Sequence, residues 1–229
     1  MLHQMTARAS VEALLHGEAG IMKELAVILD EPNNSMDNTD KLLQPMEVAE
    51  FLAKASPLTM DEYTALLNYL RQAGHPYRAV HEIPYPQNAV ILPPNAERVQ
   101  QMHHGGRTFS SRRSHKGNSA IQFYNPFTQI KATGFIEMIW RIPLEASIQT
   151  FIVVRPHQLL PIVEEEQAPF IQRPGFLTRI VDAVPSDSLC IIEPRHIITH
   201  LVTFERPLGT YNINRRTLLI CWALNRGRQ

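Results

Sequence analysis

The first part of this chain carries apolar side chains at helical spacing. In the clearest stretch they lie three and four positions apart, at Tyr63, Leu66, Leu67 and Leu70. Thr59 and Glu62 have the spacing of a capping box, in which each side chain accepts a backbone N–H at the start of a helix. Gly74 follows as the residue type that ends helices in a left-handed conformation. We therefore predict a helix over residues 60–72.

Two further patterns upstream also favour helices. An amphipathic stripe has its apolar residues at Ile21, Leu25, Ile28 and Leu29. Pro45 suits the first position of another helix, because the backbone N–H that proline lacks has no partner there. We expect residues 1–73 to form a helical region, with a domain boundary near Gly74.

From residue 74 onward the pattern changes to short runs rich in Ile, Val, Phe and Trp, separated by Pro and Gly. The candidate strands cover residues 89–92, 120–124, 134–141, 149–155, 177–183, 188–192, 197–204 and 216–224. Residues 96–104 fit either one helical turn or a short strand. Such closely spaced runs are typical of a closed antiparallel unit. We predict an α+β fold in which residues 74–229 form a mostly antiparallel β-barrel module, with Trp140, Phe151, Ile198 and Leu219 buried in it.

The charges are distributed unevenly, although the chain as a whole carries no net charge. Residues 1–95 hold 6 Lys and Arg against 12 Asp and Glu, whereas residues 96–229 hold 16 against 10. This asymmetry indicates that the two regions have different partners, or that each binds the other. No apolar run approaches the roughly 20 residues that a membrane-spanning helix needs, so we expect no membrane partner.

Basic residues are concentrated in a window without acids, residues 98–136. Within it, residues 105–118 (GGRTFSSRRSHKGN) combine Gly and Ser with Arg107, Arg112, Arg113 and Lys116. Cationic side chains, hydroxyls and free backbone amides are the groups that contact nucleic-acid phosphates. We predict that these four residues lie on an exposed loop and bind DNA or another polyanion. The alternative is a solvated loop whose charges bind nothing in particular.

Two cysteines and two histidines have the ligand count of a structural zinc site: Cys190, Cys221, His196 and His200. The apolar flanks of the histidines predict a strand, on which residues four apart lie about 13 Å apart. One ion cannot bind both at that distance. We therefore predict no metal site, structural histidines and two buried, reduced thiols.

The sequence offers no motif for catalysis. It contains no Gly-x-Ser-x-Gly elbow for a nucleophile, and its acidic residues are scattered. We expect no catalytic residue, no cofactor and no small-molecule substrate. An enzyme of a kind that these motifs do not cover is a third alternative for the function.

Several short motifs resemble the C-terminal, post-catalytic tail of fungal CACTA-like (Plavaka-type) DNA transposases. They are residues 6–15 (TARASVEALL), 91–94 (ILPP), 106–110 (GRTFS), 117–119 (GNS), 134–140 (GFIEMIW), 150–154 (TFIVV), 193–200 (EPRHIITH) and 221–227 (CWALNRG). The three metal-binding carboxylates of such an enzyme's core have no counterpart here. The resemblance thus implies an accessory piece that does not cleave DNA.

The β-rich block over residues 134–224 also looks like a bromo-adjacent homology (BAH) domain, which begins with a Gly-x-Ile-x-x-Ile-Trp strand. Together the resemblances imply a non-catalytic, transposase-derived binding module that contacts chromatin protein or DNA. The alternative is an assembly piece whose acidic helices dock on its own basic barrel or on that of a sister subunit. We expect an intracellular protein, nuclear where chromatin is the partner. The sequence does not specify the oligomeric state.

Overall fold

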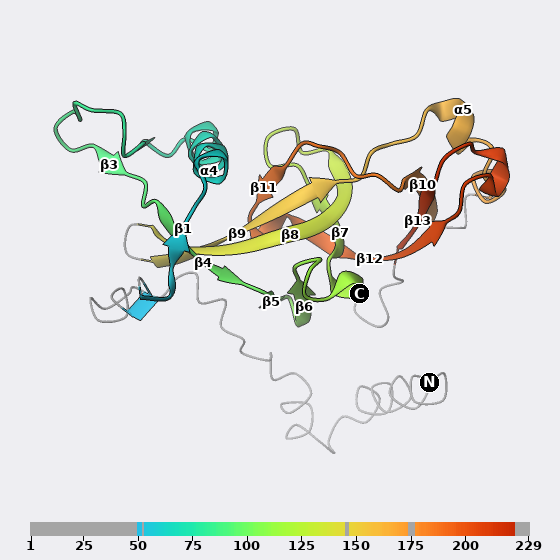
Figure 1. The fold of residues 1–229 in the computed structure, drawn as a ribbon, viewed down its shortest axis with the longest axis horizontal. Coiled ribbons are helices and arrows are strands. Elements are labelled where there is room, and N and C mark those ends of the chain that lie inside the picture. The colour runs from blue at the N-terminus through green and yellow to red at the C-terminus, as the bar shows by residue number, and fades with distance from the viewer. Residues whose placement is uncertain (1–49, 52, 145–146, 174–176, 223–229) are drawn as a thin grey trace, which may run out of the picture.

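A computed structural model describes residues 50–51, 53–144, 147–173 and 177–222 (Figure 1). Helix α4 covers Met60–Gln72 and helix α5 covers Ile162–Glu165. Short 3₁₀ helices lie at Lys116–Asn118 (η1), Pro194–His196 (η2) and Thr210–Asn212 (η3). The strands are β1 Ser56–Pro57, β2 Tyr77–Arg78, β3 Val90–Ile91, β4 Asn95–Val99, β5 Gln101–His104, β6 Arg107–Ser110, β7 Ala120–Tyr124, β8 Lys131–Leu144, β9 Ser147–Pro156, β10 Thr178–Asp182, β11 Cys190–Ile192, β12 Ile197–Arg206 and β13 Thr217–Trp222.

Helix α4 confirms the helix predicted over residues 60–72. The backbone N–H of Glu62 donates to the Thr59 hydroxyl, and the N–H of Thr59 donates to the Glu62 carboxylate, which completes the capping box. Gly74 has a φ of 91°, in the left-handed region where glycine is favoured, and the helix ends just before it. The predicted helices before residue 50 lie outside the described residues.

The strands form one large sheet in the order β1-β4-β8-β7-β12-β13-β10, with β9 between β8 and β11. Its centre is the long hairpin of β8 and β9, paired from Gly134 opposite Pro156 to Leu144 opposite Ser147. Residues 96–104 contribute to two strands. β4 pairs with β8, whereas β5 pairs with β6 in a separate hairpin. The other candidate strands are confirmed within a few residues at their ends.

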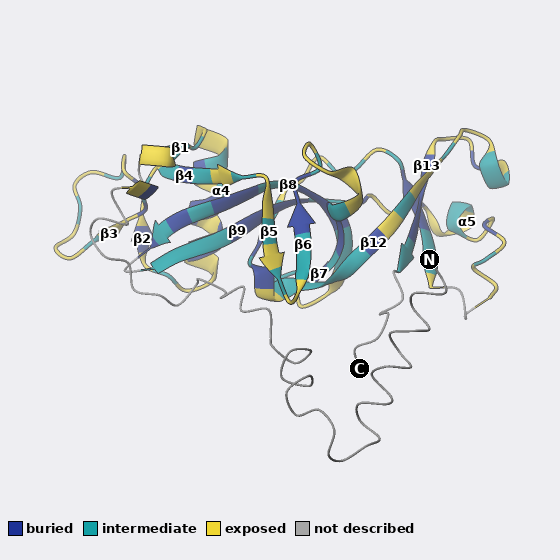
Figure 2. Cartoon of the chain, turned by 90° about the horizontal axis from the view of Figure 1, so that it is seen from below, coloured by how far each residue is buried: buried dark blue, intermediate teal, exposed yellow. Residues whose placement is uncertain are grey.

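Strands β8 and β9 bury side chains on both of their faces, because successive residues of a strand point to opposite sides. The side chains on one face pack with helix α4, namely Trp140, Ile142, Phe151 and Val153. Those on the other face pack with strand β6, namely Ile139, Ile152 and Val154. Figure 1 shows α4 and the β5–β6 hairpin on opposite sides of these strands, and Figure 2 shows the buried stretches along them.

The sheet is open, so the prediction of an α+β fold with a closed, BAH-like barrel is wrong. The structure is mostly antiparallel sheet, and its terminal strands β1, β10 and β11 do not pair with one another. Beside β10, Leu159 makes an isolated bridge to Val181 and covers part of its outer edge. Short β-branched runs suit an open sheet as well as a barrel, since closure depends on pairing between residues far apart in sequence.

The predicted core residues are confirmed except for one. Trp140, Phe151 and Leu219 are buried, whereas Ile198 is half-buried. Its strand, β12, pairs with β7 through a register shift between Ile197 and Thr199, so that the alternation is interrupted beside Ile198.

Helix α4 shares its hydrophobic cluster with the sheet, although the predicted domain boundary lies directly after it. Leu66 and Leu70 of α4 lie in one cluster with Trp140 and Phe151. Tyr63 donates a hydrogen bond of 3.0 Å to the carbonyl of Leu92. None of the described helices is both long and apolar enough to cross a membrane.

Candidate nucleic-acid interface

The predicted basic loop is an ordered hairpin and turn. Gly105 and Gly106 have φ values of 55° and 68°, which joins β5 to β6 in a tight turn that favours glycine. Phe109 of β6 is buried against the sheet. The backbone N–H of His115 donates to the carbonyl of Ser111, and η1 follows directly. The four predicted residues are therefore held at defined positions.

Arg107 lies on strand β6, so its predicted place on an exposed loop is corrected. Its side chain is half-buried, and its Nη1 donates a hydrogen bond of 3.1 Å to the Thr199 hydroxyl on β12. The neighbouring His200 stacks on Phe109 with ring centroids 4.1 Å apart. Burial and the charge of Arg107 lower the pKa of His200. Arg107 thus links its own strand, β6, to β12.

Arg112 and Arg155 share a single carboxylate. The guanidinium of Arg112 lies 4.3 Å from the centre of the Phe135 ring and 3.7 Å from Glu137. Arg155 approaches the same Glu137 Oε1 at 3.4 Å. About a third of each arginine side chain remains exposed, 31% and 33%. This group carries one more positive charge than negative charge.

Lys116 and Arg216 share a second carboxylate. Lys116 Nζ donates to Glu205 Oε1 at 2.7 Å, and Arg216 Nη2 donates to Glu205 Oε2 at 3.0 Å. The hydrogen bond and charge of Lys116, with a smaller contribution from Arg216, hold the pKa of Glu205 below its ordinary value. Both cations stay exposed, at 52% and 69%. This group also has a surplus positive charge.

Arg113 lies between Arg112 and Lys116 in the sequence. Its side chain is exposed, and it forms no ion pair with any described residue. We call the six cations the basic cluster: Arg107, Arg112, Arg113, Lys116, Arg155 and Arg216. Isolated ion pairs on a protein surface contribute only about 0–1 kcal/mol. A phosphate can therefore replace the carboxylate of such a pair at little cost in stability.

The sequence did not indicate Arg155, Arg216 or their carboxylates as parts of this cluster. Glu205 follows Lys116 by 89 positions, and no local pattern connects the two. The pairing of β12 with β7 and β13 brings them together. Arg155 and Arg216 are visible in the sequence as cations, but no local pattern indicates that they share carboxylates with the predicted loop.

The cysteines and histidines considered for zinc are dispersed over the sheet. Cys190 lies on β11 and Cys221 on β13, and both are free thiols and half-buried. His200 lies on β12, whereas His196 lies in η2, so the prediction that both are on one strand is wrong. Within the described residues no three His, Cys, Asp or Glu side chains gather as metal ligands.

Comparisons with protein families, with curated proteins and with solved structures found no match to this chain.

Proposed function

We propose that this chain is a non-catalytic binding module that contacts DNA through the basic cluster. The observation that carries the proposal is the sharing of carboxylates. Glu137 and Glu205 each neutralise only one of their two cations. The remaining charge faces solvent, where it can meet phosphates.

The geometry supports contacts to the phosphate backbone more than to bases. Arg113 and Lys116 lie on a turn and a single 3₁₀ turn, which are unlike the recognition helix that enters a major groove. Backbone contacts fix the position of a protein on DNA without reading sequence. We therefore expect weak sequence preference. The resemblance to transposase tails is a second reason to expect DNA, and it too remains a prediction.

Salt dependence tests the proposal, because each neutralised phosphate contributes about 0.9 to the slope of log affinity against log salt. Contacts from the four residues predicted from the sequence give a slope of about −3.6. Binding of a labelled duplex is measured at several salt concentrations for the parent and for the Arg113→Gln, Lys116→Gln double variant. In the variant the slope should become less negative by about 1.8, because two phosphate contacts are lost.

The structure favours this double variant over replacing all four residues. Arg107 and Arg112 make internal contacts with Thr199 and Phe135, so replacing them disturbs the fold as well as the charge. A matched control is Arg78→Gln with Arg173→Gln, which removes two exposed cations elsewhere. The control should keep the parent slope. An equal loss of slope in both double variants overturns the proposal.

A parent that binds no duplex even at low salt also overturns the proposal. The assembly alternative then explains the cluster as a surface for acidic segments. The described residues contain contacts of that kind, such as Arg179 of β10 with Glu165 of α5. Arg98 of β4 donates to Glu62 of α4 at 2.6 Å, so an acidic helix already meets a basic strand there.

A further inference from the structure

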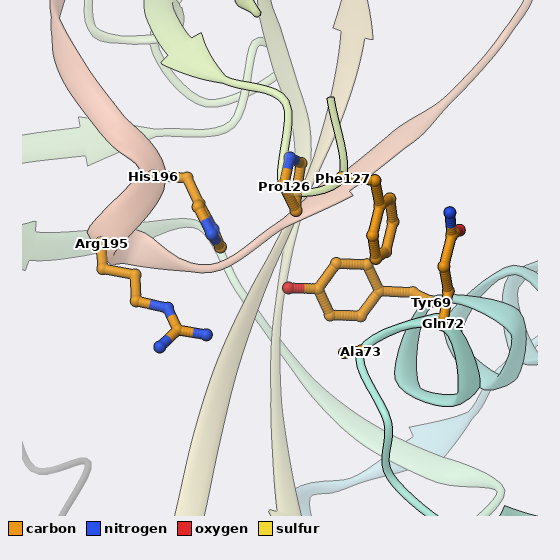
Figure 3. Close-up of a pocket in the computed structure, with 7 residues that line it drawn as sticks. All are labelled: Tyr69, Gln72, Ala73, Pro126, Phe127, Arg195 and His196. Atoms are coloured by element: carbon orange, nitrogen blue, oxygen red, sulfur yellow. The ribbon is translucent and has the colours of Figure 1, made fainter. Parts of the chain in front are cut away.

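A pocket lies at the opposite end of β7 from η1, between the end of α4, the loop after β7, and η2 (Figure 3). It has a volume of about 470 Å³, within the range of small-ligand sites. Its lining includes Tyr69, Gln72, Pro126, Phe127, Arg195 and His196. The Glu193 carboxylate lies beside this lining, since Tyr69 and Arg195 both donate to it. The basic cluster contributes none of these residues.

The pocket has an aromatic wall whose rings are fixed. Tyr69 donates a hydrogen bond of 2.8 Å to Glu193, and its ring centre lies 5.5 Å from that of Phe127. Phe127 is 39% exposed despite its apolar ring. The backbone N–H groups of Phe127 and Thr128 both donate to the Asn125 side chain, which fixes the loop. An exposed ring is thus held ready for stacking.

The opposite wall supplies hydrogen-bond donors. His196 Nδ1 accepts the backbone N–H of Glu193 at 3.1 Å, and burial lowers the pKa of His196. The neutral ring therefore carries its proton on Nε2. Arg195 binds Glu193 through Nε and Nη2, which leaves Nη1 outside that ion pair. The Arg195 side chain is 73% exposed, and Figure 3 shows both residues on the side facing Tyr69.

A second exposed ring lies close to this pocket. Tyr124 is 37% exposed. Its neighbour in the chain, Phe123, pairs with Ile197, which directly follows His196. Lys131 Nζ lies 5.8 Å from the centre of the Tyr124 ring. Exposed rings interleaved with cations form the surface on which single-stranded nucleic acids stack their bases. Double-stranded DNA keeps its bases stacked inside and cannot use such rings.

We propose that this pocket binds one unpaired nucleotide of a single strand, with its base on Phe127 and its phosphate on Arg195. The inference rests on the proposed function and deepens it, because it makes unpaired nucleotides part of the ligand. Nε2 of His196 and the Gln72 amide donate to acceptors on the base edge. Tyr124 and Lys131 receive the next nucleotide.

The test compares a single-stranded oligothymidine with a duplex of equal length, for the parent and for Phe127→Ala. The variant should bind the single strand at least about fivefold more weakly, the low end of what one stacked base contributes. Its affinity for the duplex should stay unchanged. Phe204→Ala is the matched control, since Phe204 is 51% exposed and lies on β12 outside the pocket. Phe127→Tyr keeps the ring and should keep the affinity.

Each outcome decides the inference separately from the proposed function. Unchanged single-strand binding in Phe127→Ala, or an equal loss in Phe204→Ala, overturns the pocket proposal and leaves the basic cluster untouched. Loss in Phe127→Ala without rescue by Phe127→Tyr shows a structural role for the ring and also overturns it. A parent that binds the single strand through Phe127 but not the duplex supports the pocket and overturns the duplex interface. A parent that binds neither probe overturns both.

Discussion

Helix α4 and the basic cluster differ in how they attach to the same sheet. Leu66 and Leu70 of α4 are completely buried against β8 and β9, in one cluster with Trp140. In the basic cluster, the side chains of Lys116 and Arg216 bind β12 through the exposed carboxylate of Glu205. One region is held by apolar burial and the other by ion pairs in water.

This difference separates stability from binding. A fully buried Leu contributes about 1.5–3 kcal/mol to folding, whereas an exposed ion pair contributes about 0–1 kcal/mol. Lys116 and Arg216 therefore add little to the stability of the fold, and their charge remains available to a partner. Substitutions of the buried leucines of α4 should change stability and leave duplex binding as it is. Substitutions of Arg113, Lys116 or Arg216 should do the reverse.

The largest effect is expected for Leu66→Ala. Leu66 is 0% exposed on α4, and its replacement leaves a cavity in a cluster that cannot fully close. We expect a loss of about 2–5 kcal/mol in the free energy of unfolding. Urea denaturation measures it. At temperatures where the variant is folded, its slope of DNA affinity against salt should equal that of the parent.

A changed salt slope in folded Leu66→Ala contradicts the separation of stability from binding, because it shows that packing of α4 affects DNA binding by the basic cluster. Leu208→Ala is the matched control, since Leu208 is 63% exposed. This control should change stability by less than about 0.5 kcal/mol.

A pH-dependent effect is expected at His157, whose ring lies edge-on to that of Phe135 with the ring centroids 4.7 Å apart. His157 is 6% exposed, and its Nδ1 lies 3.0 Å from the Thr133 hydroxyl. Burial, with the nearby charge of Arg112, lowers the pKa of His157 to about 4. An unfolded chain has a histidine pKa of about 6.5. Between these two values the unfolded state binds a proton that the folded state does not.

Stability should therefore be fully present above pH 6.5 and fall as the pH is lowered toward 4, by about 3 kcal/mol from this residue. His157→Gln removes the titration, so its unfolding free energy should fall less between pH 6.5 and 4 than that of the parent. His81→Gln, at an exposed histidine, should keep the parent dependence. Parallel pH profiles for the parent and His157→Gln contradict the assignment.

The sequence predicted local structure well where one short segment determines it. Thr59, Glu62 and Gly74 placed both ends of α4, because caps act within a single turn of helix. The strands followed from β-branched runs such as 151–154 in β9. The open sheet did not follow, since strand order depends on pairs such as Ile197 with Phe123, far apart in the chain.

For the candidate sites, too, the sequence predicted what one segment contains and did not predict contacts between distant segments. The acid-free window predicted Arg112, Arg113 and Lys116, because a shortage of acids is visible in the sequence. It did not predict that Glu137 and Glu205 reach these cations from other strands. The pocket joins Tyr69, Phe127 and His196 from three distant segments, and no single segment indicated it.

The most direct test of the central claim is the DNA affinity of Glu205→Gln at low salt. The substitution removes the carboxylate that Lys116 and Arg216 share, and leaves both cations in place. A unit charge about 8 Å from a phosphate in water contributes about 0.5 kcal/mol, so duplex affinity should rise by about twofold or more. Glu166→Gln, at the exposed glutamate that directly follows α5, changes the net charge equally and should leave affinity unchanged. Weaker binding by Glu205→Gln, or the same rise in both variants, contradicts an interface built on shared carboxylates.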